Sequence, residues 1–197
     1  MISDHRLHRA MKLFWRREYF DISVEELGAR AGLDRAAIYG KFGSKQKLFE
    51  ALLGRFRDRV TARNLEPLEA KGAGLAAVEQ FFNQFRDMRR KADSRLGCLI
   101  CRTAAEVSPL MPSVARIVSA FLDDLRALFA RACRNARRQG ELARRVDEVK
   151  VADSLTGAVL GLMALARCPA PSSAIANYDD GVLSYLHDLK PSPRRER

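Results

Sequence analysis

The chain has 197 residues, of which 47% are hydrophobic and 30% charged, and it carries a formal net charge of +11 with a pI near 10.0. This composition provides enough apolar side chains for a packed core, and its positive charge favours a polyanionic partner. We expect no membrane partner, because the strongest apolar run, Leu155 to Ala166, is shorter than the about 20 residues that span a bilayer.

The N-terminal residues predict an amphipathic helix and not a secretion signal. Charged residues interrupt the apolar positions between 2 and 14, which argues against a signal peptide. Without such a signal, the cysteines at 98, 101, 133 and 168 indicate reduced thiols, so we expect a cytoplasmic protein. A helix over about 4–17 places four apolar side chains on one side: Leu7, Ala10, Met11 and Phe14.

Residues 23–32 predict a short helix with defined ends. Ser23 and Glu26 form a capping box, in which the Ser23 hydroxyl accepts from the Glu26 amide and the Glu26 carboxylate accepts from the Ser23 amide. Gly32 ends the helix, because glycine adopts the left-handed backbone conformation at little cost. Leu33 then fills the corner that leads to the next helix.

A second short helix follows, which Asp34 can cap and Gly43 ends. It is expected to bury Ala37, Ile38 and Phe42. It leaves five residues on or near its outer side: Arg35, Ala36, Tyr39, Gly40 and Lys41. Two short helices joined by a glycine-bearing turn are the pattern of a helix-turn-helix, whose second helix reads the DNA major groove.

The remainder of the chain also has helical periodicity and no strand pattern. A long helix begins near Lys45, after the cap Ser44, and ends before Pro67, while residues 71–74 look like a loop. The polar tail 190–197 is expected to be disordered. Further helices are predicted over about 75–90, 96–107 (closed by Ser108-Pro109), 111–138, 149–166 and 174–189.

The segment AGLDRAAIYGKFGSKQKLF resembles the TetR (tetracycline-repressor-like) family of transcriptional regulators. That family shows Ala-Gly-hydrophobic-Ser, small or polar residues, hydrophobic-Tyr, a short break with Phe, and Ser-Lys before a Leu. The resemblance covers about residues 7–53, because the family's first helix is matched by Ala10, Leu13, Phe14 and Tyr19.

Two positions depart from the family pattern. Glu18 stands where glycine is common, which suggests a different corner between the first two helices. Ile22 stands where threonine is common, which removes a hydroxyl that could reach a phosphate.

The resemblance implies an all-α fold with an N-terminal three-helix helix-turn-helix DNA-binding head and a C-terminal helical bundle that forms a ligand pocket and a dimer interface. We expect the head at 1–62, with the helix-turn-helix at about 23–42, and the effector-binding and dimerisation domain at 73–189. The runs QGELARRVD and GLMALAR also resemble the C-terminal part of many such chains, whose last long helices pair with their two-fold mates.

Gly157 and Gly161 lie four residues apart on one helix face, where two helix backbones can approach closely. Packing within one chain is one interpretation, and a homodimer interface is the other. We favour the homodimer, because a helix-turn-helix dimer reads two half-sites.

Phosphate contacts are implied by the resemblance for Tyr39, Lys45 and the amides at the start of the helix after Ser44. Cations and helix N-termini both attract phosphate oxygens, which supports these assignments. Ser23 and its neighbouring amides are expected to anchor the other edge of the groove.

Base reading is assigned to residues on the outer side of the second short helix. Arg35 can pair bidentately with a guanine, and Lys41 is a second candidate, although either residue could contact phosphate only. Ala36 and Gly40 allow close approach or contact with a thymine methyl group.

Cys98 and Cys101 lie at a predicted helix start, with Arg95 and Arg102 nearby. A helix N-terminus and nearby cations lower a thiol pKa, so Cys98 is a candidate effector- or redox-sensing thiolate with Cys101 beside it. The resemblance adds that some TetR-like regulators with Gly-Cys here sense oxidants or electrophiles. Alternatively both are small buried apolar residues. Two thiols lack a second ligand pair for zinc, and we expect no metal or cofactor.

Four phenylalanines, namely Phe81, Phe82, Phe85 and Phe121, are candidates for lining an effector pocket, because such pockets are lined by aromatic and apolar groups. Core packing is the alternative for each of them.

These observations predict a sequence-specific transcriptional regulator, a repressor that a small-molecule or electrophile effector releases from double-stranded operator DNA. We expect no enzyme, because no Ser-His-Asp, paired-carboxylate, metal or phosphate-loop pattern is present in the sequence. The alternative is a helical interaction protein whose basic head binds acidic partners and not specific DNA.

Overall fold

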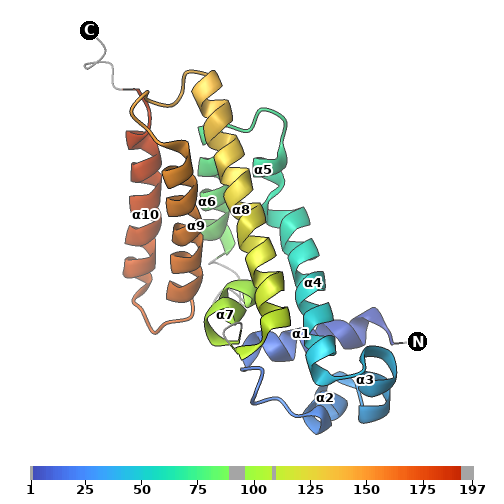
Figure 1. The fold of residues 1–197 in the computed structure, drawn as a ribbon. Coiled ribbons are helices and arrows are strands. Elements are labelled where there is room, and N and C mark those ends of the chain that lie inside the picture. Colours follow the sequence, from blue (N-terminus) through green and yellow to red (C-terminus); the bar gives the residue numbers. More distant parts are fainter. Residues whose placement is uncertain (1, 89–95, 108–109, 192–197) are drawn as a thin grey trace. The chain divides into compact units, whose positions relative to one another are not determined.

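The described part of the chain is built from α-helices alone. The computed structural model describes residues 2–88, 96–107 and 110–191, apart from the side chains of residues 60–62 and 88. Within these ranges there is no strand, which confirms the all-α fold class (Figure 1). The helices in chain order are α1 (Asp4–Arg16), α2 (Val24–Ala31), α3 (Arg35–Phe42), α4 (Lys45–Asn64), α5 (Glu66–Glu69), α6 (Leu75–Met88), α7 (Leu99–Glu106), α8 (Pro112–Arg138), α9 (Glu148–Leu165) and α10 (Ser172–Asp188).

The structure adds one short helix to those predicted and shifts the ends of others. Pro67 lies in the first turn of α5, a position that tolerates proline because the amide there has no helical partner. From sequence alone, this proline indicates only a helix end. α7 begins at Leu99, with Cys98 as its N-cap, and not at 96. Three expectations lie outside the described residues: helix at 89–90, the closing Ser108-Pro109, and disorder at 192–197.

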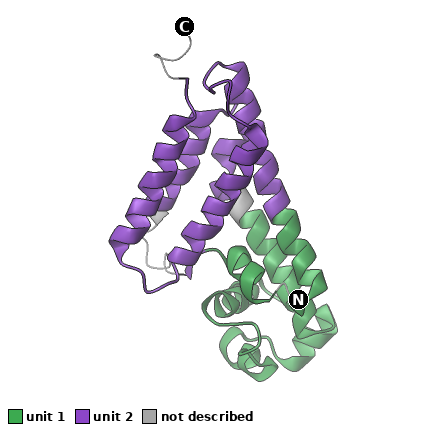
Figure 2. Cartoon of the chain, turned by 60° about the vertical axis from the view of Figure 1, so that its left-hand side comes forward, with its two compact units in different colours: residues 1–59, 98–121 green, residues 60–97, 122–197 purple. Residues whose placement is uncertain are grey.

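The chain forms two compact units (Figure 2). Unit 1 contains residues 1–59 and 98–121, and unit 2 contains residues 60–97 and 122–197. The sequence predicts a head that ends at 62 and a second domain that begins at 73. By contacts, α7 and the first part of α8 group with the N-terminal helices.

The core of unit 1 positions the short helices α2 and α3. Phe49 of α4 is 2% exposed, and its ring centroid lies 4.9 Å from those of Phe14 and Tyr19. Ile22, which stands where the resembling family commonly has threonine, is fully buried. Burial of a side chain of this size stabilises a fold by about 1.5–3 kcal/mol. The apolar face of α1 is buried as its periodicity predicts, through Leu7, Ala10, Met11 and Phe14.

Side-chain hydrogen bonds join the first turn of α8 to α4 within unit 1. Ser113 Oγ donates to Glu50 Oε1 at 2.5 Å, and Gln46 Nε2 donates to Ser113 Oγ at 2.8 Å. Burial opposes ionisation of Glu50, but hydrogen bonds from Ser113, Lys47 and Gln46 outweigh it, so the pKa of Glu50 lies below its ordinary value. The start of α8 is therefore tied to a charged side chain of α4.

Unit 2 packs around a group of phenylalanine rings. α6 packs beside α5 and α10, and α9 packs beside α10. The Phe81 centroid lies 5.0 Å from that of Phe85 and 5.4 Å from that of Phe129, and the Phe82 ring stacks on Phe129 at 5.9 Å. All four side chains are buried.

Candidate nucleic-acid interface

The first helix of the helix-turn-helix has the ends that the sequence predicts. The Ser23 hydroxyl accepts from the Glu26 amide at 3.0 Å. Gly32 has a φ of 69° and its amide donates to Gly28 O at 3.0 Å, as a left-handed helix end requires. Of the capping box, only the Ser23 half is described. The Glu26 carboxylate instead accepts from Arg17 at 2.5 Å and from Arg30 at 2.9 Å.

The second helix of the motif, α3, presents one face to solvent. The Asp34 carboxylate accepts from the Ala37 amide at 2.8 Å, and Gly43 ends the helix with a φ of 82°. Ile38 is fully buried, whereas Ala37 and Phe42 are only half-buried. The exposure predicted for the outer residues is confirmed for all five: Arg35, Ala36, Tyr39, Gly40 and Lys41.

Two cations on this surface lie over aromatic rings. The Arg35 guanidinium carbon lies 5.6 Å from the Tyr39 ring centroid, and Arg35 Nη2 donates to Glu25 Oε1 at 3.0 Å. Lys41 Nζ lies 5.7 Å from the Phe42 ring centroid. Both cations remain at the surface, where a polyanion can reach them.

Lys45, at the start of α4, is half-buried above an aromatic ring. Its ammonium nitrogen lies 4.2 Å from the Tyr19 ring centroid, within cation–π range. Burial lowers the pKa of Lys45, and the nearby Asp21 carboxylate acts in the opposite direction. Burial also raises the pKa of Tyr19, which keeps its phenol neutral. Sequence reasoning gave Tyr19 no role at this site, although the Tyr19-Phe20 pair just before the motif is a visible signal.

Gly40 has open space around its Cα. A Cβ built there meets no atom within 4 Å, and the same is true of Gly54 in α4. Packing inside the protein therefore does not require glycine at position 40.

The thiols at the start of α7 differ in acidity. A hydrogen bond from the Cys101 thiol and backbone amides of Cys101 and Ile100 lower the pKa of Cys98, and burial only partly opposes them. The same interaction and burial raise the pKa of Cys101 well above its ordinary value. Cys98 is half-buried and Cys101 buried, and both are free thiols. The described residues contain no cluster of side chains that could hold a metal ion.

The four phenylalanines proposed for an effector pocket are all buried. Phe81, Phe82 and Phe85 lie together in the core of unit 2, and Phe121 belongs by its contacts to unit 1. None of them lines the surface pocket described next.

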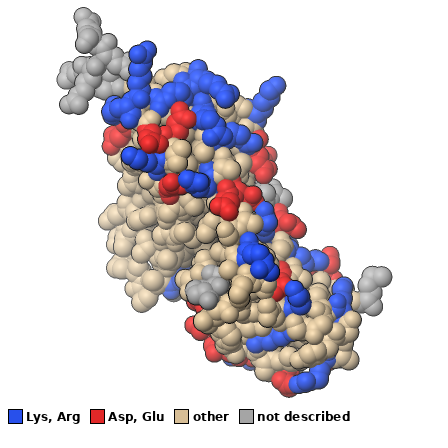
Figure 3. Space-filling view, in the orientation of Figure 1, with Lys and Arg blue, Asp and Glu red and all other residues tan. Residues whose placement is uncertain are grey.

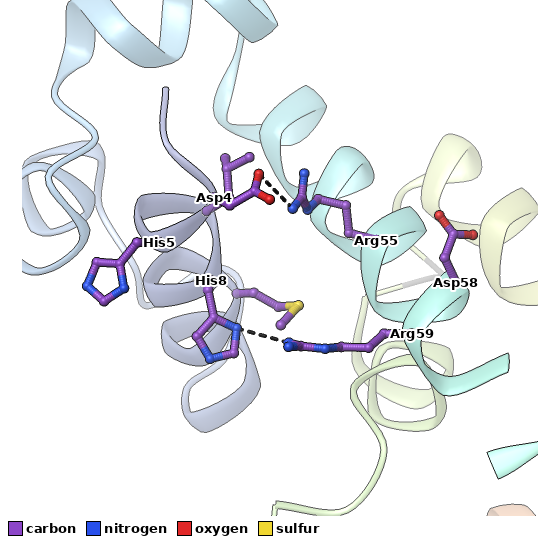
Figure 4. Close-up of a pocket in the computed structure, with 8 residues that line it drawn as sticks. Asp4, His5, His8, Arg55, Asp58 and Arg59 are labelled. Carbon is purple, nitrogen blue, oxygen red and sulfur yellow. Dashed lines mark hydrogen bonds and ion pairs between the residues drawn. The ribbon is translucent and has the colours of Figure 1, made fainter. Parts of the chain in front are cut away.

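A pocket of about 710 Å³ lies between α1 and α4, and sequence reasoning missed it (Figure 4). Arg55 Nη2 lies 3.0 Å from Asp4 Oδ1, and Arg59 Nη1 lies 3.1 Å from His8 Nδ1. These pairs cross the pocket from one helix to the other. The available signal was a polar stripe at helical spacing on each helix. The lining residues are Asp4, His5, Leu7, His8, Met11, Arg55, Asp58 and Arg59.

The two glycines of α9 differ in their surroundings. Gly157 is exposed, and a Cβ there meets no atom within 4 Å. A Cβ at Gly161 would lie 2.6 Å from Tyr178 Oη of α10, so Gly161 accommodates a side chain of its own chain.

Among the described residues, none of the helices combines the length and the apolar character needed to cross a membrane.

Comparison with known proteins identifies both parts of the chain. Residues 7–52 match the family described as bacterial regulatory proteins, tetR family. Residues 74–178, more than half of the chain, match the family described as tetracyclin repressor-like, C-terminal domain.

Similar proteins share nearly the whole length. The uncharacterised HTH-type transcriptional regulator YezE of Bacillus subtilis (strain 168) is 28% identical over 181 residues, which cover 91% of this chain and 93% of YezE. The HTH-type transcriptional repressor ComR of Escherichia coli (strain K12) is 27% identical over 166 residues, covering 83% of this chain and 79% of ComR. A solved structure of a cysteine mutant of the TetR-family regulator CifR, in complex with 26-base-pair double-strand operator DNA, has a TM-score of 0.80 at 23% identity, covering 92% of this chain and 95% of that chain. The chain therefore belongs to the TetR family of DNA-binding transcriptional regulators.

Proposed function

We propose that this protein is a cytoplasmic, non-enzymatic repressor that binds operator DNA as a homodimer and leaves it when an effector binds. The observation that carries the proposal is the exposed face of α3, which is held between capped helix ends and presents Arg35 and Lys41 to solvent. The operator complex of CifR supports DNA binding, and the name of ComR, a transcriptional repressor, supports repression.

Base contacts are assigned to the exposed face of α3. Arg35 is the first residue of this helix, and recognition helices contact base edges with their N-terminal residues. Arg35 pairs with a guanine, Lys41 reads a second position, and Ala36 and Gly40 lie against the bases or a thymine methyl group.

Phosphate contacts are assigned around the motif. Tyr39 and Lys45 bind one strand together with the amides at the start of α4. The Ser23 hydroxyl accepts from the Glu26 amide and donates to the Glu25 carboxylate, so its proton would have to turn from Glu25 to a phosphate oxygen in the complex. Ser23 therefore anchors the opposite edge of the groove.

Dimerisation is assigned to the outer face of α9 and α10. Figure 3 shows a surface largely free of Lys, Arg, Asp and Glu over the lower part of these helices, whereas charged side chains gather over their upper ends. Tyr178 and Tyr185 are each 37% exposed and lie seven positions apart on α10, and Gly157 of α9 and Gly181 of α10 are exposed as well. A second copy would cover this face and set the two recognition helices about 34–36 Å apart, the spacing of successive major grooves.

Release from operator DNA is a shift of the dimer between two conformational states. In one state the two recognition helices fit successive major grooves, and in the other their separation differs. An effector that binds the second state more tightly shifts the dimer toward it. The free energy of operator binding then weakens by the coupling energy, which is typically about 1–3 kcal/mol. We assign the effector to the small-molecule or electrophile class.

Cys98 is a second candidate for the site where the effector acts. The hydrogen bond from Cys101 and the backbone hydrogen bonds lower the pKa of Cys98, which increases the thiolate fraction, and the thiolate is the reactive form. Its sulfur would form a carbon–sulfur bond with an electrophile such as a quinone, whose ring accepts the electron pair and then a proton. A measured thiol pKa above about 8.5, the unperturbed value, would exclude this role.

A gel-shift experiment tests DNA recognition. Duplexes from the DNA that flanks the coding region are mixed with the protein at about 0.15 M salt and excess competitor DNA. A repressor retains one duplex against the competitor. Weak binding of every duplex alike would instead support a basic interaction protein.

A further inference from the structure

Arg35, the first residue of the recognition helix, is held by side chains from both helices of the motif. Its Nη2 atom donates to Glu25 Oε1 of α2 at 3.0 Å, and its guanidinium carbon lies 5.6 Å from the ring centroid of Tyr39 in α3. The Arg35 and Glu25 side chains are each 70% exposed, so their pair lies at the surface. Glu25 is an acid on the same surface as the assigned DNA contacts.

The contact with Glu25 leaves Arg35 able to read a base. A guanidinium has five N–H donors in a rigid plane, and bidentate pairing with guanine O6 and N7 needs only two of them. An arginine without a partner samples many rotamers and loses this freedom when it binds. Because Glu25 and Tyr39 restrict those rotamers beforehand, Arg35 has less freedom to lose.

Glu25 also affects contacts that depend on charge alone. A hydrogen bond from its own backbone amide lowers the pKa of Glu25, and bonds from Arg35 and Ser23 add to this effect, so the side chain is a carboxylate at neutral pH. A carboxylate near DNA phosphates is repelled by them. The same charge competes with phosphate oxygens for Arg35, which disfavours binding modes in which Arg35 touches only the backbone.

We propose that Glu25 determines sequence specificity by positioning Arg35 for a guanine and by disfavouring phosphate-only binding. The inference rests on the proposed operator binding and adds a residue to it. Glu25 is a positioning residue, because it acts through Arg35 and not through a base.

The test is a double-mutant cycle with two duplexes of equal length. One duplex is enriched from a random pool by the wild-type protein, and the other has random sequence. The dissociation constants for both are measured at about 0.15 M salt for wild type, Glu25→Ala, Arg35→Ala and the double variant. The ratio of the two constants is the specificity. Glu18→Ala is the matched control, because it removes another exposed acid at the corner between α1 and α2. Thermal unfolding checks that each variant is folded.

We expect Glu25→Ala to lower the specificity ratio by about two- to fivefold, the range of an exposed ion pair. The loss should map to a guanine when single positions of the enriched duplex are changed. In the Arg35→Ala background, removal of Glu25 should leave the ratio unchanged. Glu18→Ala should change affinity for both duplexes by the same factor.

Two results would overturn the role of Glu25 alone. One is an unchanged ratio in Glu25→Ala, and the other is an equal fall of the ratio with and without Arg35. If the wild-type protein enriches no sequence at all, operator binding itself is wrong and the inference falls with it.

Discussion

Arg102 Nη1 donates a hydrogen bond to the backbone carbonyl of Trp15 at 3.1 Å, and the Arg102 side chain is 4% exposed. Trp15 lies in the last turn of α1, where carbonyls have no partner within the helix. Arg102 also donates to the Phe14 carbonyl at 3.4 Å and to Glu106 Oε2 at 2.6 Å. An arginine of α7 thus caps the end of α1 within unit 1.

Arg102→Met should remove these bonds while it keeps much of the side-chain volume. We expect the free energy of unfolding to fall by about 1–3 kcal/mol, because buried carbonyls at the end of α1 lose their donor. Urea unfolding measures the change. Arg116→Met, at an exposed arginine of α8 in the same unit, is the control and should stay within about 0.5 kcal/mol of wild type. Equal urea midpoints of unfolding for Arg102→Met and Arg116→Met would contradict the capping role of Arg102.

Gly40→Ala should separate stability from DNA binding. Alanine is favoured over glycine inside a helix by up to about 1 kcal/mol, and nothing within 4 Å opposes a Cβ at position 40. We therefore expect higher stability together with weaker operator binding, because the added methyl group faces the DNA.

Gly54→Ala is the matched control for this experiment, since Gly54 lies in α4 with equally open space. Both variants should unfold at higher denaturant concentration, and only Gly40→Ala should bind the enriched duplex less tightly. Unchanged binding by Gly40→Ala would remove Gly40 from the interface.

Local features of the reading motif could be predicted from the sequence. The caps Ser23 and Asp34 and the end at Gly32 depend on residues three or four positions apart, so a linear pattern contains them. The exposed face of α3 follows from the same spacing around the buried Ile38. These predictions needed no knowledge of the tertiary fold.

Contacts between distant segments could not be predicted in this way. Arg102 caps a carbonyl 87 positions away, and Glu25 holds an arginine of the next helix across the turn. The spacing of Gly157 and Gly161 predicts a close approach of another helix, but it does not show that the neighbour of Gly161 within the chain is Tyr178. In each case the partner is chosen by the fold and not by helical periodicity.

His8 is expected to make unit 1 sensitive to acid. Burial lowers the pKa of His8, and the positive charges of Arg59, Lys12 and His5 lower it further. An unfolded histidine titrates near about 6.5, so below this pH the unfolded chain binds more protons than the folded protein does. The stability that His8 contributes is therefore present above about 6.5 and is lost as pH falls through the lower folded pKa.

His8→Gln should flatten the fall in unfolding free energy between about pH 7.5 and 5.5. His187→Gln, at an exposed histidine of α10, should leave that fall intact. Urea unfolding at several pH values gives the comparison. A wild-type slope in His8→Gln would show that another group is responsible.

Gly157→Arg should convert the proposed dimer to a monomer. Gly157 is an exposed glycine of α9, where an arginine would place a desolvated charge between two copies. Sedimentation velocity measures whether each variant is a monomer or a dimer. Ala127→Arg, at an exposed alanine of α8, is the control and should remain dimeric. A dimeric Gly157→Arg variant would place the interface elsewhere.

Lys45→Gln should weaken binding to every duplex alike. The Lys45 ammonium group lies over the Tyr19 ring and is assigned to a DNA phosphate. Its loss should therefore lower the affinity for enriched and random duplexes by the same factor. The slope of log affinity against log salt should fall by about one, because one fewer counterion is released. Lys47→Gln is the control in the same first turn, where Lys47 Nζ lies 2.9 Å from Glu50 Oε2 and its charge is already balanced. A loss confined to the enriched duplex would make Lys45 a base reader, and equal slopes for the two variants would show that Lys45 contributes no phosphate contact of its own.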